Sequence, residues 1–453
     1  MKPIKYYSTN LKAEPVSFGD ALLQGQAPDR GLYMPDHIPL LDHTQLESFS
    51  NMSYPEIAFE VLNRFLKDEI PEDKLRDLVF DAYNYIVPLE HAYERKYVMR
   101  LDQGPTASFK DFAARMMGRL MNHFLEKNSR ELLILTATSG DTGSAIANAF
   151  YGLNNIKVLI LFPEKEVTSR QRKQMTTLGK NVKVIAIDGK FDDCQAMVKQ
   201  AFADPDLSGL NLSSANSINI GRLLPQSVYY FYAWAKLRNS NDDKPVFVIP
   251  SGNFGDMMGG MIARHMGLLV KQMVIAVNEN DEFPSFLETG KYNKIEPSLN
   301  CISSAMNVGH PSNLSRLVAL YGGVMDEKGG IHKVPDMENM RKDISAVSIS
   351  DSETKKSIAD AWGKYQLLLE PHGAVGWAAL QQYVNSKANA GQDELFVVLE
   401  TAHPAKFPEK IQEILGFDPK LPPSLQGLEE KQEDYELLEN GYKHFKSYLV
   451  RGL

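Results

Sequence analysis

The chain has 453 residues and a formal net charge of −8, from 49 lysines and arginines against 57 aspartates and glutamates. Hydrophobic residues make up 43% and charged residues 23%, an ordinary globular composition that excludes disordered and collagen-like chains. The length suggests about three domains. A negative surface repels nucleic-acid phosphates, so we expect no nucleic-acid partner.

The longest apolar run, residues 228–235, is far shorter than the roughly 20 residues that a membrane span needs. The first residues carry positive charge, but no apolar segment follows them, so we expect neither a secretion signal nor a membrane partner. The two cysteines, Cys194 and Cys301, lie far apart and form no CxxC motif. This usage favours a reducing, cytoplasmic location.

The first part of the chain reads as a helical cap. Helical patterns cover 57–67 and 74–85, and a connector rich in proline, aspartate and glycine lies at 27–39. We therefore predict an N-terminal cap domain over residues 1–92.

Six short, mostly aliphatic runs follow, each before a turn and a candidate helix: 132–135, 158–162, 182–187, 246–249, 274–277 and 395–399. Such runs are typical of parallel strands buried on both faces by helices, so we predict an α/β fold for the centre of the chain. Ligands bind outside the carboxyl ends of such strands, which makes the turns after these runs the candidate sites.

The C-terminal residues 419–453 read as a linker followed by a solvated helix. The linker holds two adjacent prolines and a glycine, and residues 429–436 carry five acids and one lysine. An acidic docking surface is the alternative interpretation of this run.

Several common catalytic motifs are absent. The chain contains no GxGxxG, GxxxxGK[ST], GxSxG or HExxH, which removes the usual support for dehydrogenase, P-loop kinase, serine hydrolase and zinc protease functions. The ten histidines lack metal-ligand spacing, so we expect no metal site.

The most informative segment, residues 104–112, ends in a predicted helix start. Ser108 and Asp111 have the spacing of a capping box, and apolar residues then recur at helical spacing, which places Lys110 in the first turn. A cation is disfavoured at that end of the helix dipole, and Phe109 and Phe112 could desolvate it further. The neutral, nucleophilic amine that a Schiff base needs is then more accessible. A surface lysine in a first turn is the alternative.

Two further turns lie between a predicted strand and a predicted helix. Residues 137–145 place hydroxyls and backbone N–H groups at a helix N-terminus, where a carboxylate binds well. Residues 251–256, Ser-Gly-Asn-Phe-Gly-Asp, let the backbone approach an anion closely and lack a Walker lysine, so N–H groups and the helix dipole would hold a cofactor phosphate. Plain helix-capping turns are the alternative for both.

Two other segments complete the set. Residues 216–222 cluster two amides, a hydroxyl and a guanidinium, which could bind a second phosphate. A polar loop with a solvated arginine is the alternative. Residues 400–407, Glu-Thr-Ala-His-Pro-Ala-Lys-Phe, follow the last predicted strand and could simply reverse the chain.

In this order, the segments resemble the pyridoxal-phosphate enzymes of the tryptophan-synthase β-subunit fold type, and specifically the threonine synthase family. The resemblance spans nearly the whole chain, from residues 16–35 to the string 401–407. Sister enzymes such as serine dehydratases and cysteine synthases usually lack these two segments. The resemblance implies two open, twisted, mostly parallel sheet lobes beside the cap: a large lobe (93–116 and 226–418) and a small mobile lobe (117–225).

The resemblance also implies roles for individual residues. Lys110 would be the catalytic lysine that binds pyridoxal 5′-phosphate, with Asp141 beside the cofactor ring and Thr401 at its pyridine nitrogen. Many relatives have asparagine where this chain has Asp141, and glycine is common where it has Arg30. The other cofactor-binding residues would be Gly252, Asn253, Phe254, Gly255 and Asp256. The substrate carboxylate would meet Ser139, Gly140 and Thr142, and the substrate phosphate would meet Asn216, Ser217, Asn219 and Arg222.

The implied reaction converts O-phospho-L-homoserine and water to L-threonine and phosphate, the last step of threonine biosynthesis, catalysed by a carbon–oxygen lyase. A pyridoxal-phosphate-dependent threonine or serine dehydratase is the enzymatic alternative. A catalytically silent ligand-binding homologue is the alternative from another class. The sequence leaves a monomer and a homodimer equally open.

Overall fold

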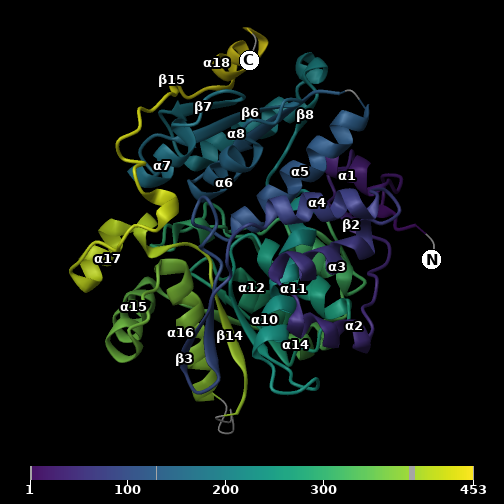
Figure 1. The fold of residues 1–453 in the computed structure, drawn as a ribbon. Coiled ribbons are helices and arrows are strands. Elements are labelled where there is room, and N and C mark those ends of the chain that lie inside the picture. Colours follow the sequence, from purple (N-terminus) through teal and green to yellow (C-terminus); the bar gives the residue numbers. More distant parts are fainter. Residues whose placement is uncertain (1–2, 129, 387–392, 452–453) are drawn as a thin grey trace.

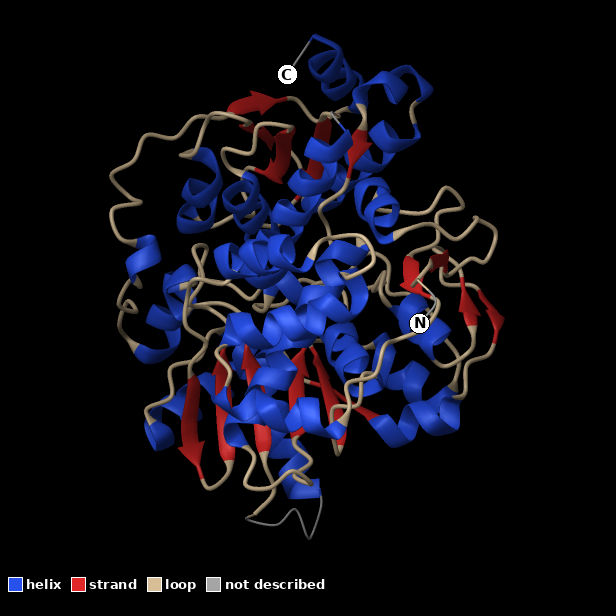
Figure 2. Ribbon diagram, turned by 45° about the vertical axis from the view of Figure 1, so that its right-hand side comes forward, coloured by secondary structure: helices blue, strands red, loops and turns tan. Residues whose placement is uncertain are grey.

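A computed structural model describes residues 3–128, 130–386 and 393–451. Two open sheets lie at opposite ends of the molecule, with the N-terminal region beside them (Figure 1). Figure 2 shows the strands of the larger sheet side by side in the lower half and those of the smaller sheet at the top, with helices between them. Within the described ranges, no helix is both long and apolar enough to cross a bilayer.

The N-terminal region is mainly helical. Helix α3 begins with a capping box between Ser53 and Glu56, and it and α4 correspond to the helices predicted at 57–67 and 74–85. A short antiparallel ribbon of β1 and β2 completes the region. Its elements are β1 (Tyr6–Ser8), α1 (Phe18–Gln24), β2 (Tyr33–Pro35), α2 (His43–Ser48), the 3-10 helix η1 (Phe49–Asn51), α3 (Tyr54–Leu66) and α4 (Glu72–Ala82).

Arg30 adopts a left-handed backbone conformation with φ of 68°. This region favours glycine, because a side chain there crowds the backbone. The turn geometry therefore gives a physical reason why glycine suits this position.

The large lobe is built on a six-stranded sheet in the order β13-β10-β9-β14-β4-β3, parallel except for the edge strand β3. The runs predicted at 246–249, 274–277 and 395–399 are β9, β10 and β14, and α16 packs across all three. The elements of this lobe are β3 (Leu89–Tyr93), β4 (Lys96–Arg100), α10 (Val228–Leu237), β9 (Val246–Pro250), α11 (Gly255–His265), β10 (Gln272–Val277), α12 (Glu282–Thr289), η4 (Ser304–Met306), α13 (Leu314–Leu320), β11 (Val324–Met325), β12 (Ile331–Lys333), α14 (Met337–Asp343), β13 (Ile344–Ser348), α15 (Asp351–Tyr365), α16 (Pro371–Ser386), β14 (Phe396–Glu400), η5 (Pro404–Lys406) and α17 (Pro408–Leu415).

The small lobe is built on a five-stranded parallel sheet in the order β15-β7-β6-β5-β8. The runs predicted at 132–135, 158–162 and 182–187 are β5, β6 and β7, and α6 and α8 pack against the sheet. Its elements, with the helices that join it to the large lobe, are α5 (Lys110–Asn128), β5 (Leu132–Ala137), α6 (Asp141–Phe150), β6 (Ile156–Pro163), α7 (Ser169–Thr176), β7 (Val182–Ile187), α8 (Phe191–Ala203), η2 (Pro205–Leu210), β8 (Leu212–Ser213), α9 (Ile220–Leu223) and η3 (Leu224–Ser227).

The ends of the lobes differ from the predicted divisions. Strand β3 crosses residue 92 and pairs with β4, so it belongs to the large sheet. After η6 (Pro423–Leu425), β15 (Glu436–Leu438) pairs with β7, and α18 (Tyr442–Arg451) packs on α8. The expected C-terminal helix is present, but the acidic run before it is more than a solvated segment: Glu433 accepts hydrogen bonds of 2.8 Å from Nε and Nη2 of Arg172.

Candidate active site

Loops that follow β5, β9 and β14 converge at the carboxyl ends of these strands, where ligands bind in parallel sheets. The loop after β14 also pairs with the segment that precedes α5. The N–H of Phe109 donates to the carbonyl of Thr401 at 2.8 Å, and the N–H of His403 donates to that of Ala107 at 3.0 Å. These bonds place Lys110 beside the end of β14.

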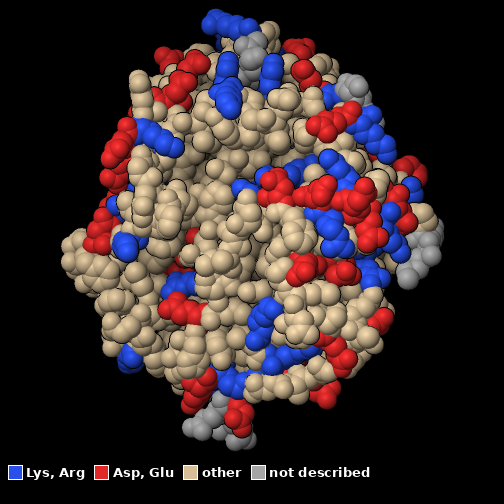
Figure 3. Space-filling view, viewed as in Figure 1, with Lys and Arg blue, Asp and Glu red and all other residues tan. Residues whose placement is uncertain are grey.

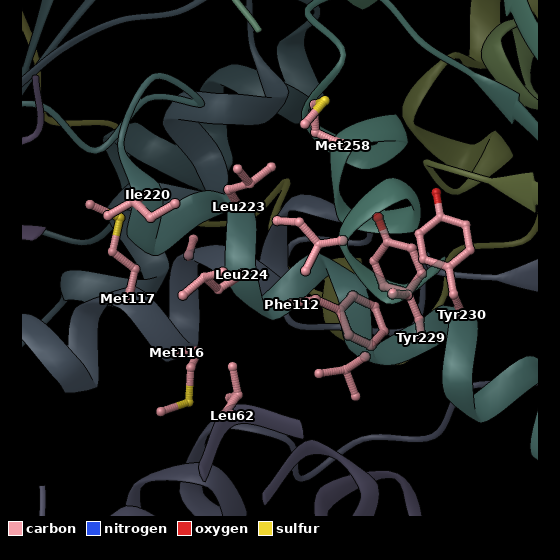
Figure 4. Close-up of a cluster of buried hydrophobic side chains, with 14 of the residues drawn as sticks. Leu62, Phe112, Met116, Met117, Ile220, Leu223, Leu224, Tyr229, Tyr230 and Met258 are labelled. Atoms are coloured by element: carbon pink, nitrogen blue, oxygen red, sulfur yellow. The ribbon is translucent and has the colours of Figure 1, made fainter. Parts of the chain in front are cut away.

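Helix α5 begins at Lys110, so this lysine lies in the first turn as predicted, and the apolar face of the helix anchors the site. Figure 4 shows Phe112, Met116 and Met117 packed with side chains of α9, η3 and α10. A helix held in this way along its buried face keeps its first residue at a fixed position. Lys110 therefore stands on a rigid element.

The amine of Lys110 is in an unusual environment. Its side chain is 14% exposed, and Nζ lies 4.6 Å from the ring centroid of Phe109. Burial lowers the pKa of Lys110, Asp141 opposes that shift, and the positive charges of Lys406 and Arg222 reinforce it. The net effect favours the neutral, nucleophilic amine.

Two details of the predicted helix start are wrong. Asp111 does not form a capping box with Ser108; its carboxylate accepts from the N–H and Oγ1 of Thr106, at 2.8 and 2.6 Å. Ser108 Oγ is buried without a hydrogen-bond partner among the residues that the structure describes. Phe112 packs into an aromatic cluster with Tyr54 and Tyr85. The carboxylate of Asp111 therefore binds the loop before α5 instead of capping the helix at Ser108. The ring of Phe112 packs in the aromatic core, not against Lys110.

The loop after β5 places Asp141 at the start of α6, opposite Lys110. Gly140 has φ of 131°, which favours glycine, and Thr138 Oγ1 accepts from the N–H groups of Gly140 and Gly143 at 2.9 and 2.8 Å. Among the described residues, the half-buried hydroxyls of Ser139 and Thr142 make no side-chain hydrogen bond, so they are free for a ligand.

The Asp141 carboxylate is almost fully buried between two lysines. Oδ1 lies 2.6 Å from Nζ of Lys406 and accepts from Nε2 of Gln171 at 2.9 Å, whereas Oδ2 lies 3.9 Å from Nζ of Lys110. Burial alone would raise the pKa of Asp141, but Lys406 and Lys110 outweigh it and hold the pKa below its ordinary value.

The loop after β9 is a cradle with no side-chain cation. Phe254 is left-handed, with φ of 61°, and Gly255 begins α11, so the loop turns sharply into a helix N-terminus. A Cβ at Gly252 would lie 2.8 Å from the backbone Cα of Met306, which explains the glycine. Asp256 accepts from the N–H of Met257 at 2.9 Å and from the Ser251 hydroxyl, and burial raises its pKa to about 6.

Residues 216–222, which lead into α9 and are called the Arg222 loop below, carry a positive charge instead. Arg222 is 3% exposed; its Nη1 donates to the carbonyl of Ala215 at 2.7 Å, and its Nε has no partner in the described chain. Burial lowers the pKa of Arg222 to about 10. The Oδ1 atom of Asn216 is also buried without a partner among those residues. A buried guanidinium with an unsatisfied donor is suited to binding an anion.

This positive charge is local. On the face shown in Figure 3, acidic and basic side chains are interspersed. The Arg222 loop is joined to the glycine loop by a hydrogen bond from Asn253 Nδ2 to Ser217 Oγ. Asn313 bridges the same two loops, because its Nδ2 donates to the carbonyls of Ser217 and Asn253 at 3.3 and 2.8 Å. Asn219 has a different role: its Nδ2 donates to the carbonyls of Leu22 and Ser214, and its Oδ1 accepts from Gly221 N–H, so its amide holds the loop.

Thr401 directly follows β14 and lies next to two buried acids, Glu370 and Glu400. Its hydroxyl donates to Oε1 of Glu370 at 3.5 Å, and Glu370 also contacts the imidazole of His372. Burial and the charge of Glu370 raise the pKa of Glu400 well above its ordinary value. The described residues contain no group of three or more histidine, cysteine, aspartate or glutamate side chains placed to hold a metal ion.

Sequence reasoning missed several residues of the site. Lys406 lies in the segment 400–407, but nothing in that segment indicates a role for it, and Gln171 and Glu370 belong to no motif. Arg316, fully buried on α13, donates to the carbonyls of Ser217 and Ile218 at 3.2 and 2.7 Å and so supports the Arg222 loop. The only local signal for any of these is the charge of Lys406 in a short turn that directly follows the buried strand β14.

Sequence models of known families match nearly the whole chain. The model described as "Threonine synthase N terminus" matches residues 5–83, "Pyridoxal-phosphate dependent enzyme" matches 87–400, and "Threonine synthase, C-terminal" matches 373–449. The matches therefore include both terminal segments as well as the two lobes.

Individual relatives agree with these matches. A threonine synthase of Escherichia coli is 38% identical over 423 residues, which cover 93% of this chain and 94% of the relative. A PLP-bound threonine synthase from Brucella melitensis superposes with a TM-score of 0.91 at 36% identity, over 99% of both chains. The threonine synthase from yeast gives a TM-score of 0.90 at 30% identity, over 98% of both chains.

Proposed function

The chain belongs to the threonine synthase family of pyridoxal-phosphate-dependent enzymes, and we propose that its reaction is carried by Lys110 in the site described above. The activity is that of a threonine synthase, which converts O-phospho-L-homoserine and water to L-threonine and phosphate. Similarity along the whole chain, including both terminal segments, favours this activity over that of a dehydratase.

The residues of the site fit pyridoxal phosphate. Lys110 offers a buried amine whose pKa is lowered, and the loop from Gly252 to Gly255 offers a glycine cradle at a helix N-terminus for the cofactor phosphate. Asn253 and Asp256 hold that loop in shape, and Thr401 is the candidate partner of the pyridine nitrogen. When bound, the cofactor supplies an aldehyde that a lysine amine can hold and a ring that stores electrons released from the substrate.

The single observation that carries the proposal is the position of the Lys110 amine, buried and adjacent to Asp141. When it is not bound to the cofactor, the amine of Lys110 would act as a base that moves protons at Cα, Cβ and Cγ of the substrate in turn. One base suffices because these carbons are neighbours.

The substrate would lie between two loops. The hydroxyls of Ser139 and Thr142, at the N-terminus of α6, would receive its carboxylate, whereas the N–H of Gly140 already donates to Thr138. The guanidinium of Arg222, with Asn216 and Ser217 beside it, is placed to receive its phosphate and to stabilise the charge of that group as it leaves. Asn219 and Arg316 hold this loop in position.

We also propose that the small lobe closes over the substrate to exclude water until it is needed at Cβ. Residues 117–225 form this lobe in the proposal, and β15 with α18 moves with them because both pack on it. A cytoplasmic location fits Cys194 and Cys301, which are both free and buried.

The proposal is tested with Lys110→Ala. The wild type loaded with cofactor should show visible absorption and should release phosphate from O-phospho-L-homoserine; the variant should lose both, with at least about 10³-fold less phosphate release. Lys127→Ala, in the last turn of the same helix, is the matched control and should keep both. Cofactor binding without phosphate release in the wild type would favour a catalytically silent homologue.

A further inference from the structure

Lys406 is the second lysine beside Asp141, and it is more deeply buried and closer to that carboxylate than Lys110 is. Its side chain is fully buried, whereas that of Lys110 is 14% exposed. Its Nζ lies 2.6 Å from Oδ1 of Asp141 and donates to the carbonyl of Thr106 at 2.8 Å. Lys406 thus links its own turn, the start of α6 and the loop before α5.

The two carboxylate oxygens of Asp141 have different partners. Oδ1 is shared by Lys406 and Gln171, and Oδ2 faces Lys110 from 3.9 Å. A buried carboxylate needs a close cation, because an unpaired charge in the interior is costly. Without Lys406, the only cation left within 4 Å of Asp141 in the described chain is Lys110. The carboxylate would then hold Lys110 as an ammonium ion.

We propose that Lys406 is a positioning residue for the reaction: it engages Asp141 so that this carboxylate does not capture Lys110, whose amine then loses its proton more readily and stays free to bind the cofactor. The inference rests on the proposed role of Lys110. The proton that Lys110 gives up goes to solvent, and no other group changes its protonation.

The charged groups that act on Lys110 come from four elements. They are Asp141 on α6, Lys406 on η5, Arg222 on α9 and Asp256 on α11. Two are positive and two negative, so removing Lys406 leaves an excess of negative charge around Lys110. The predicted direction of the effect is therefore fixed: loss of Lys406 makes Lys110 harder to deprotonate.

The test measures the reactivity of Lys110 directly. The cofactor-free full chain is labelled with acetic anhydride across a range of pH, and acetylation of Lys110 is followed by mass spectrometry. The rate reports the neutral fraction of that amine. Relative to the wild type, Lys406→Met should shift the pH profile of the Lys110 acetylation rate upward by about one pH unit. At any pH below the pKa of Lys110, this shift corresponds to labelling that is about tenfold slower. Lys406→Arg, which keeps the charge, should stay near the wild type.

Substitution of Asp141, the partner of Lys406, completes a double-mutant cycle. Asp141→Asn should shift the pH profile of Lys110 labelling downward, because only Asp256 then opposes the charges of Lys406 and Arg222, and Asp141→Asn/Lys406→Met should return it close to the wild type. Lys410→Met, an exposed lysine paired with Glu413 on α17, is the control and should leave the profile unchanged.

Overlapping profiles for the wild type and a folded Lys406→Met would overturn the proposal. If Lys406→Met does not fold, the other two variants decide, since equal profiles for Asp141→Asn and the double variant would show that the Lys406 charge does not reach Lys110. A separate arm tests the proposed function: pyridoxal phosphate should protect Lys110 of the wild type from acetylation. Missing protection would remove Lys110 from cofactor binding, whatever the Lys406 variants show.

Discussion

The glycine loop after β9 and the loop that carries Arg222 are both suited to anions, but by opposite means. Residues 251–256 contain no cation, and their one ionisable side chain, Asp256, is an acid whose pKa is raised to about 6 by burial. The other loop offers a buried guanidinium that forms no ion pair within the described residues.

The difference follows from what each anion does. A cofactor phosphate stays in place, so shape and neutral N–H donors suffice. A substrate phosphate gains charge as its bond to carbon breaks, and a preorganised cation stabilises that change. A chain with a net charge of −8 can therefore handle two phosphates, because one site needs no charge and the other supplies it locally. The bond from Asn253 to Ser217 fixes the spacing of the two sites.

Among the changes that compare the two loops, the largest expected effect is at Arg222. Arg222→Met removes the cation from the departing phosphate, and we expect kcat/KM for O-phospho-L-homoserine to fall by about 10²–10³-fold while the cofactor still binds. Because burial lowers the pKa of Arg222 to about 10, its charge costs stability throughout the range below that pH. The ligand-free variant should thus be more stable than the wild type, by about 1 kcal/mol or more.

Steady-state kinetics and denaturant unfolding check both parts of this prediction. Arg76→Met, an exposed arginine on α4, is the control and should change neither. A loss of cofactor binding in Arg222→Met with unchanged turnover of the loaded enzyme would assign the two phosphates the other way round.

The next effect is the pH dependence of stability at Asp256. Its folded pKa of about 6 lies above the value of roughly 3.9 for an unfolded aspartate, so the folded chain holds the extra proton between these values. The wild type should therefore lose up to about 3 kcal/mol of unfolding free energy relative to Asp256→Asn as the pH rises from 4 to 6.5.

Guanidinium unfolding of the ligand-free chain at several pH values measures this difference. Asp77→Asn, on the exposed side of α4, should not reproduce it. A constant difference between the wild type and Asp256→Asn over this range would mean that Asp256 is ionised throughout, and the glycine loop would then be negatively charged at low pH as well.

The smallest expected effect compares two glycines of the neutral loop. A Cβ at Gly252 would lie 2.8 Å from the Met306 backbone, whereas one at Gly255 would lie 3.3 Å from the side-chain amide of Gln226, a longer distance and not to backbone. Gly252→Ala must shift the backbone N–H groups, so we expect its Kd for pyridoxal phosphate to rise about tenfold. Gly255→Ala should change it less than about threefold. Equilibrium dialysis measures both, and equal effects would contradict a cradle defined by the backbone.

Local patterns predicted the parts of the fold that depend on local physics. The buried strands were visible because parallel strands covered on both faces are continuously apolar, and the helix start at Lys110 was visible in its spacing. Strand β15 was missed because three edge residues, two of them exposed, carry no such pattern. The capping box failed because Thr106, two residues before Ser108, takes the Asp111 carboxylate.

The site was predictable only in part, because local patterns along the sequence do not show contacts between distant segments. Its loops could be located from strand ends and glycines, and the family resemblance supplied their roles. The pairing of Lys406 with Asp141 depends on three segments meeting in space, and the support of the Arg222 loop by Arg316 depends on the packing of α13. Neither leaves a signal in the spacing of residues along the chain.

The most direct test of the account follows the oxygen of water. The wild type with cofactor is incubated with O-phospho-L-homoserine in ¹⁸O-water, and the products are identified by mass spectrometry. Water that adds at Cβ should place one ¹⁸O in the hydroxyl of L-threonine, and the phosphate should leave unlabelled because its bond to carbon is the one that breaks. Labelled phosphate with homoserine, or ammonia with a keto acid, would contradict the account.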